Sequence, residues 1–156
     1  MNVGGFYLRI KPRNLRSNIS VCSTQCEKEE LIIKKVQSTS INTARIIAGF
    51  AADKKAENII ILDMRKVANF CDYFVICSGD SDRQLKAIAQ GIDEGLKDLG
   101  INLHLKHGMK STTWILLDTG DVVVHIFETQ AREFYGLEYL WQDAKQVAWK
   151  KSNLKR

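Results

Sequence analysis

Two short, almost uninterrupted apolar runs constrain the fold of this chain more than any other feature. Ile59–Leu62 and Val122–Phe127 have the length of β-strands, whereas a membrane-spanning helix needs roughly 18 apolar residues. A strand with apolar side chains on both faces has to be covered on both faces, as happens when helices pack on a sheet. We therefore expect a helix-covered sheet that does not span a bilayer.

The length of the chain limits it to one such domain. Its 156 residues match one ordinary domain with tails, because domains cluster at about 100 to 150 residues. With 45% apolar residues, 26% charged residues and a single proline, the chain can bury a core. We expect residues 1–40 to be a flexible basic extension, residues 41–145 to be the domain, and residues 146–156 to be a basic tail.

Two segments have the periodicity of amphipathic helices. The first is predicted at about 42–55. The second follows the turn at 79–82, in which Ser81 or Asp82 can serve as the N-cap, and it ends before Gly100. The apolar positions that recur at three- and four-residue spacing are Ile47, Phe50 and Ala51 in the first segment and Leu85, Ile88, Ala89, Ile92, Leu96 and Leu99 in the second.

The other elements complete an α/β chain. Together with Asn58–Asp63, the predicted strands are Tyr73–Ser78, Asn102–His107, Thr113–Leu117 and Val122–Phe127. The last two form a hairpin across the polar turn at 118–121, and this hairpin makes the sheet mixed, since its strands are antiparallel. A helical region is predicted from Thr129 to about Lys150, broken at Gly136. The sequence therefore predicts a mixed five-stranded sheet flanked by helices.

The charge is divided unevenly along the chain. The formal net charge is +5, but residues 1–40 and residues 146–156 each carry a net +4. Residues 41–145 hold twelve basic and fifteen acidic side chains. Because affinity for nucleic acid rests mainly on Lys and Arg, a mildly acidic domain suits a basic protein partner better. The basic ends leave open a direct contact with RNA.

The cysteines and the N-terminal composition bear on the compartment. Cysteines at positions 22, 26, 71 and 77 lack the paired spacing of a zinc site, and they favour a reducing compartment. Residues 1–24 are basic and contain no Asp or Glu, a composition shared by organellar transit peptides and by leaders without a targeting role. We expect a cytoplasmic protein, or one of an organellar matrix if residues 1–24 act as a transit peptide.

The turn at 79–82 leaves one catalytic alternative open. Its amides could hold an anion at a helix N-terminus, but Asp80 and Asp82 would repel phosphate unless a divalent metal lay between. Val122–Phe127 supplies no further carboxylate, and a helix cap is the plainer interpretation. His125 is interpreted as a core or interface residue. The alternative function is a divergent metal-dependent nucleotidyl- or phosphoryl-transferase.

The segment 130–143 is unusually rich in aromatic residues. Its sequence, QAREFYGLEYLWQD, contains four large aromatics within eight residues. Phe134, Leu137 and Leu140 can face the sheet at three- and four-residue spacing, with Trp141 either beside them or outside. Tyr135 then lies outside that stripe. These aromatics either seal a small core or form a binding hot spot.

Four ordered blocks of the sequence resemble one family. The blocks are DYFVI at 72–76, GxSxRQ at 79–84, WILLDxGDVVVHIF at 114–127 and RxFYxLExLW at 132–141. Together they cover the predicted domain, and they resemble the ribosomal silencing factor family, also called Iojap-like. The N-terminal 40 residues and the tail after Val147 are not explained by the family pattern.

The resemblance implies a fold and a function. The fold would be similar to that of nucleotidyltransferases but without their catalytic carboxylates, since the matching strand reads VVVHIF. The function would be non-enzymatic, with no catalytic residue, metal or cofactor. The protein would bind the large ribosomal subunit through its ribosomal protein numbered fourteen, block joining of the small subunit, and repress translation when nutrients are short. The resemblance is also compatible with a homodimer formed through the same apolar surface.

The residues that would carry this binding follow from the aromatic segment and the matched blocks. We expect three aromatic anchors, three acids that complement a basic partner, and one arginine that makes a polar or bidentate contact. These are Trp114, Tyr135 and Trp141 as anchors, Asp121, Glu128 and Glu138 as acids, and Arg132 as the arginine.

Overall fold

The computed structural model describes residues 39–110 and 113–149, so the predictions for residues 1–38 and for the tail from residue 150 lie outside the described residues. In chain order the elements are α2 (Ser40–Asp53), β1 (Glu57–Asp63), β2 (Tyr73–Gly79), α3 (Asp82–Asp98), β3 (Leu105–His107), β4 (Trp114–Asp118), β5 (Val122–Glu128), α4 (Thr129–Tyr135), α5 (Leu137–Leu140) and β6 (Lys145–Val147). Within these ranges, no helix combines the length and the apolar character needed to cross a membrane.

The strands form one mixed sheet in the order β3-β4-β5-β2-β1-β6. The central strands β2 and β5 are parallel, and all other neighbours are antiparallel. The predicted α/β class and the predicted mixed sheet are confirmed. The strand predicted at Asn102–His107 is shorter than expected, because only its last three residues pair with β4.

The sixth strand corrects the prediction for the C-terminal region. The helix expected up to Lys150 ends at Leu140, and β6 instead pairs with Ile61–Asp63 of β1. Just beyond β6, the indole Nε1 of Trp149 donates a 2.8 Å hydrogen bond to the carbonyl of Ile59. The expected boundary after residue 145 therefore falls inside β6. A strand of three residues is too short to have a recognisable period.

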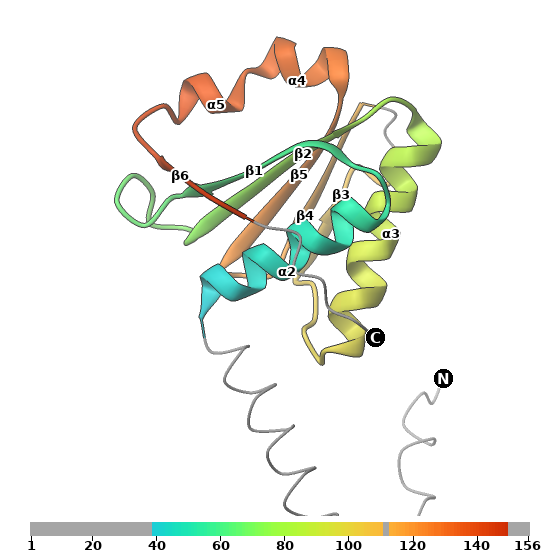
Figure 1. The fold of residues 1–156 in the computed structure, drawn as a ribbon, viewed down its shortest axis with the longest axis horizontal. Coiled ribbons are helices and arrows are strands. Elements are labelled where there is room, and N and C mark those ends of the chain that lie inside the picture. Colours follow the sequence, from blue (N-terminus) through green and yellow to red (C-terminus); the bar gives the residue numbers. More distant parts are fainter. Residues whose placement is uncertain (1–38, 111–112, 150–156) are drawn as a thin grey trace, which may run out of the picture. The chain divides into compact units, whose positions relative to one another are not determined.

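Helices lie on both faces of the sheet (Figure 1). On one face, α2 and α3 cover the first core, which includes Val122, Val124 and Ile126 of β5. On the other face, α4 and α5 cover the second core, which includes Val123 and Phe127 of the same strand. The alternation of β5 between two covered faces is what its apolar run predicted.

The first strand is less buried than its apolar run predicted. Its second half is buried at Ile61 and Leu62, whereas Ile59 and Ile60 before them are only half-buried. The pairing of β1 with β2 shifts register between Glu57 and Ile60, and β6 covers only the second half. The first half of β1 therefore lies at an edge of the sheet, and full burial was the wrong expectation.

The two helices of the first face pack closely because α3 contains glycines. The five apolar residues of α3 from Leu85 to Leu96 are buried as predicted, and Ser81 is its N-cap. A Cβ atom at Gly95 would lie 2.6 Å from the ring of Phe50 in α2. A Cβ atom at Gly91 would lie 2.5 Å from the Lys54 side chain. The close approach of α2 to α3 therefore depends on Gly95, where the neighbour is an aromatic ring.

His125 is a core residue of the second face. It is 5% exposed, and its ring lies 4.7 Å from that of Phe74 and 5.8 Å from that of Trp114, measured between centroids. Among the described residues, neither ring nitrogen has a hydrogen-bond partner. Burial lowers the pKa of His125 from its ordinary value to about 4, since an apolar site disfavours the imidazolium. The ring is therefore neutral at pH 7.

Replacing the glycines of α3 tests the packing of α2 on α3. Alanine in a helix interior gains about 1 kcal/mol over glycine, but overpacking a core costs about 1–3 kcal/mol. We expect Gly95→Ala to lower the free energy of unfolding by about 1 kcal/mol, measured by urea denaturation. Gly91→Ala is the matched control, because the exposed Lys54 can swing away, and it should leave stability unchanged or higher. Equal effects of the two changes would contradict this account.

Titration tests the burial of His125. Because its pKa is lowered in the folded state, the unfolded chain binds a proton first as the pH falls below about 6.5. The free energy of unfolding should then drop by about 1 kcal/mol per pH unit between pH 6 and pH 4.5. His125→Leu should remove this slope, and His107→Leu, which replaces an exposed histidine of β3, should keep it. A slope that survives in His125→Leu would show that other groups cause it.

Candidate ligand-binding ridge

The helices α4 and α5 form a ridge over the second face of the sheet, and we use the word ridge for Thr129–Leu140. Gly136 separates them in the left-handed region, with φ of +52°, so the predicted break is confirmed. All ridge residues are described, and none is buried. Ala131 and Leu137 are half-buried and pack on the second core. One side of the ridge is thus attached to the sheet, and the other faces solvent.

A row of aromatic rings connects the ridge to the sheet. The centroid of Trp114 on β4 lies 5.1 Å from that of Tyr135 in the ridge, and His125 is the next ring of the row. Phe74 on β2 follows His125 and lies 6.0 Å from Trp141, just after α5. Such ring pairs contribute about 0.5–1.5 kcal/mol beyond their buried area. The three predicted anchors are therefore brought to one face.

The most exposed side chains of the ridge differ from those predicted. Phe134 and Leu140 were expected to face the sheet, but they are 83% and 69% exposed, so this prediction is wrong. Tyr139 is 86% exposed, and the sequence interpretation did not include it among the binding residues. The break at Gly136 shifts the helical phase, and three- or four-residue spacing across it no longer defines one face. Gly136 was the feature of the sequence that could have indicated this change of phase.

The three predicted anchors differ in how much of each side chain is exposed to solvent. Tyr135 is 48% exposed, whereas Trp114 and Trp141 are half-buried and pack on the second core. The ring of Phe70, in the connection between β1 and β2, lies 6.2 Å from that of Trp141 and is itself 58% exposed. Phe70 is a further aromatic residue that the sequence interpretation missed. Tyr135 and its exposed neighbours are the ridge residues best placed to meet a partner.

Two predicted binding residues contact each other. The guanidinium of Arg132 forms an ion pair with the carboxylate of Glu138, with Nε and the NH2 nitrogen each 2.7 Å from Oε1. The Arg132 side chain is 13% exposed and that of Glu138 is 32% exposed. The positive charge of Arg132 is therefore already compensated within the protein.

The remaining predicted acids lie at opposite ends of β5. Glu128 is half-buried where β5 passes into α4, and its backbone N–H donates to the carbonyl of Thr113, one residue before Trp114. Asp121 is exposed and precedes the first residue of β5, so it lies roughly 20 Å from Glu128, at about 3.3 Å per residue. The structure brings Glu128 beside the aromatic row but leaves Asp121 at the far end of the sheet.

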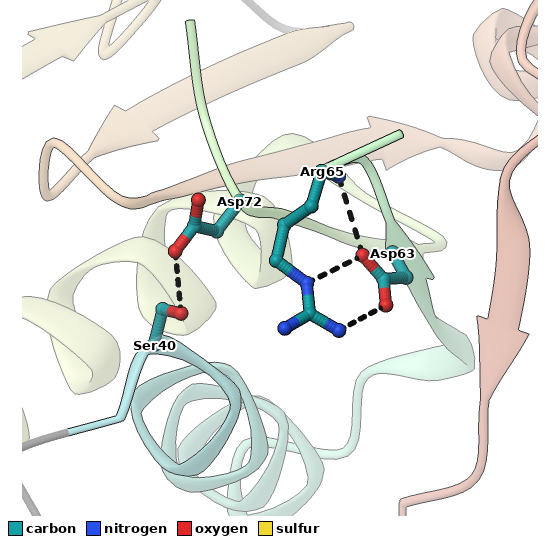
Figure 2. A network of polar contacts seen from close by, with 4 residues as sticks. All are labelled: Ser40, Asp63, Arg65 and Asp72. Carbon is teal, nitrogen blue, oxygen red and sulfur yellow. Dashed lines mark hydrogen bonds and ion pairs between the residues drawn. The ribbon is translucent and has the colours of Figure 1, made fainter. Parts of the chain in front are cut away.

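The backbone carbonyl of Asp121 accepts a 2.8 Å hydrogen bond from the N–H of Asp72, near two polar contacts at this end of the sheet. Figure 2 shows these two contacts. Arg65 donates from Nε and from its NH2 nitrogen to the two carboxylate oxygens of Asp63, at 2.9 and 2.6 Å, and lowers the pKa of that carboxyl. Ser40, at the start of α2, donates a 2.6 Å hydrogen bond to Asp72. The Ser40–Asp72 bond ties the start of α2 to the β1–β2 connection, whereas the Arg65–Asp63 pair is a local contact at the end of β1.

The polar side chains of the turn before α3 also form hydrogen bonds and ion pairs within the protein. Ser81 Oγ accepts a hydrogen bond from the backbone N–H of Gln84, so the cap interpretation is confirmed. Asp82 pairs with Lys86 at 2.8 Å, and Asp80 accepts a hydrogen bond from the hydroxyl of the first residue of α4. Within residues 39–110 and 113–149, no group of three or more His, Cys, Asp or Glu side chains could hold a metal ion.

The ridge and its flanks carry a negative charge. Segment 128–143 contains four carboxylates against a single basic residue, which is already paired. The carboxylates are Glu128, Glu133, Glu138 and Asp143. Exposed aromatic and apolar side chains within an acidic surrounding are typical of a surface that binds a basic protein. This geometry suits recognition of a macromolecule.

Comparison with known proteins places the chain in a family. A family model described as "Ribosomal silencing factor during starvation" matches residues 37–156. The ribosomal silencing factor RsfS of Bacillus subtilis is 44% identical over 100 residues, which cover 64% of this chain and 85% of the relative. The chloroplastic protein Iojap of Zea mays is 35% identical over 104 residues, covering 65% of this chain and 44% of the relative.

The fold is shared with solved structures of similar proteins. A crystal structure of a Chromobacterium violaceum protein superposes with a TM-score of 0.65 at 30% identity, and the match covers 75% of this chain and 97% of that one. A Bacillus halodurans protein superposes with a TM-score of 0.57 at 33% identity, covering 78% and 98% of the two chains. With the matched domain, its mixed sheet and the acidic aromatic ridge, the chain belongs to the ribosomal silencing factor family.

Proposed function

We propose that this protein binds the large ribosomal subunit through its ribosomal protein numbered fourteen, blocks joining of the small subunit, and so represses translation. Membership of the silencing factor family supports the ribosomal role. The observation that carries the binding mode is the ridge, whose Phe134, Tyr135 and Tyr139 are exposed within an acidic segment. Large aromatics and charge complementarity are the usual basis of protein recognition.

The proposed mechanism is steric. A standard interface removes about 800 Å² of surface from each partner, an area that a small domain can supply from one face. Once the protein occupies the large subunit, the small subunit is excluded from the same volume. Nothing in this scheme requires turnover, and the relatives are named as silencing factors. We therefore propose a regulator that is not an enzyme.

The proposed surface consists of the ridge and the adjoining aromatic row. Tyr135 and Trp114 would meet the apolar centre of the partner, with Trp141 at the other end of the row. Glu128 lies beside them and complements a basic surface, whereas Asp121 would contribute only through a partner that extends along the whole sheet. The same apolar surface suits pairing of two copies, and a homodimer would then compete with the subunit.

The place of action would follow the ribosome. Relatives include bacterial proteins and proteins named as chloroplastic and mitochondrial. We propose action in the cytoplasm, or in an organellar matrix if residues 1–24 serve as a transit peptide.

Loss of exposed ridge aromatics should release the protein from the subunit. Phe134→Ala combined with Tyr135→Ala should weaken binding to purified large subunits at least about tenfold in a sedimentation assay, because such anchors dominate interface energies. Phe134 is 83% exposed but the Tyr135 ring packs on Trp114, so the melting temperature should fall modestly while the protein stays folded. Leu105→Ala, which removes a 52% exposed side chain from β3, is the matched control and should bind normally. Unweakened binding of the double variant would contradict the proposed surface.

The basic ends should add to the affinity without carrying it. Glutamine at the basic positions Arg9, Lys11, Arg13, Arg16, Lys150, Lys151, Lys155 and Arg156 removes most of the positive charge outside the domain. We expect large-subunit binding to persist in 150 mM salt, on the order of physiological ionic strength, and its salt dependence to become shallower. Complete loss of binding would mean that RNA contacts of the tails carry it, against the acidic-ridge proposal.

A further inference from the structure

Arg132 is the most connected side chain of the ridge. Besides the ion pair with Glu138, its NH1 nitrogen donates to the backbone carbonyl of Asn58 at 2.7 Å and to the hydroxyl of Ser78 at 2.8 Å. These partners belong to three different elements, α5, β1 and β2. A guanidinium presents five N–H donors in one rigid plane, and this geometry lets a single side chain join three elements.

The acceptors of Arg132 are presented by the irregular part of β1. Asn58 has a positive φ of +47° where the register between β1 and β2 shifts. β6 pairs only with Ile61–Asp63, so the first half of β1 has no strand neighbour on its outer edge. Arg132 donates to the carbonyl of Asn58, and the indole of Trp149 donates to that of Ile59. The irregular backbone at Asn58 thus leaves its carbonyl available to accept a hydrogen bond from Arg132.

An open groove of about 760 Å³ separates the ridge from the first half of β1, and Arg132 lines it. Ser78 and Asn58 line its sheet side, and Glu138 and Tyr139 line its ridge side. Ile59 and Ile60 also line this open groove. Arg132 adds polar contacts that cross from the ridge to the sheet.

Apart from Arg132, the ridge is held by Ala131 and Leu137 on the second core and by the Tyr135 ring against Trp114. Its two helices are seven and four residues long, and helices of this length are not stable alone. The left-handed glycine between them allows the second helix to change direction relative to the first. The Arg132–Glu138 pair spans this break, since Arg132 precedes Gly136 and Glu138 follows it.

We propose that Arg132 is a positioning residue: it does not contact the ribosome but fixes the angle of the ridge, and so the arrangement of Phe134, Tyr135 and Tyr139 that the partner meets. This inference rests on the proposed function for its binding consequence. Its structural part, an ordered ridge in the free protein, stands independently. It replaces the expectation that Arg132 and Glu138 each contact the partner directly.

Hydrogen exchange in the free protein tests the structural part. Arg132→Ala should speed exchange of the ridge amides of Gly136, Leu140 and Trp141 at least about tenfold, since their helical hydrogen bonds depend on the ridge remaining docked. Amides of β2 and β5 should exchange as in the unchanged protein. Arg83→Ala, which removes an exposed cation from α3, is the charge-matched control and should alter neither set. Unchanged ridge exchange in Arg132→Ala would overturn the inference.

Large-subunit affinity tests the binding consequence. Arg132→Ala should weaken binding about tenfold. Glu138→Ala should weaken it less, because Arg132 keeps its bonds to Asn58 and Ser78, and the double variant should be no weaker than Arg132→Ala. Arg132→Lys should restore only a small part of the affinity, since an ammonium group cannot reach three acceptors in one plane. Direct contact of both side chains with the partner predicts instead that the two losses add, so that the double variant binds more weakly than Arg132→Ala alone.

The outcomes separate this inference from the proposed function. If the unchanged protein fails to bind large subunits, the proposed function fails, while the exchange experiment still decides whether Arg132 orders the ridge. If the unchanged protein binds and Arg132→Ala loosens the ridge without loss of affinity, the proposed function stands and the positioning role is wrong.

Discussion

The central parallel pair of β2 and β5 determines the rest of this structure. Both strands are buried along almost their whole length, so both faces of the sheet have to be covered. The first face is covered by two helices of 14 and 17 residues. The second is covered by a short ridge broken at a left-handed glycine, with aromatic rings beneath it. That unequal cover leaves Phe134, Tyr139 and Leu140 of the ridge in solvent.

The unequal cover provides the exposed surface that the proposed function uses. A long amphipathic helix in place of the ridge would bury Phe134 and Leu140, whereas the broken ridge exposes them. Beneath them, a neutral His125 allows the aromatic row to run across this face of the sheet without introducing a charge. Of the two acids in the catalytic alternative, Asp82 is paired with Lys86 and Asp80 accepts a hydrogen bond from Thr129. The family likeness and the surface thus lead to the same proposal, binding to a larger assembly.

Much of the fold follows from local patterns in the sequence. The periodicity of α3, its Ser81 cap and the alternation of β5 each depend on residues close in the chain, and each prediction is confirmed. The three-residue β6 was missed because only its pairing with β1 makes it a strand. In the ridge, the sequence identified the aromatic segment but not the direction of Phe134, because the chain turns at Gly136. The hydrogen bonds of Arg132 could not be predicted either, since its partners Asn58 and Ser78 lie more than fifty residues away in the sequence.

Subunit joining tests the central claim most directly. Large subunits saturated with this protein would be mixed with small subunits, and the formation of joined ribosomes would be followed by light scattering. The account predicts that joining falls in proportion to the fraction of large subunits occupied, with no nucleotide or metal required beyond the ribosome's own ions. Joining at the normal rate and to the normal extent by fully occupied large subunits would contradict it.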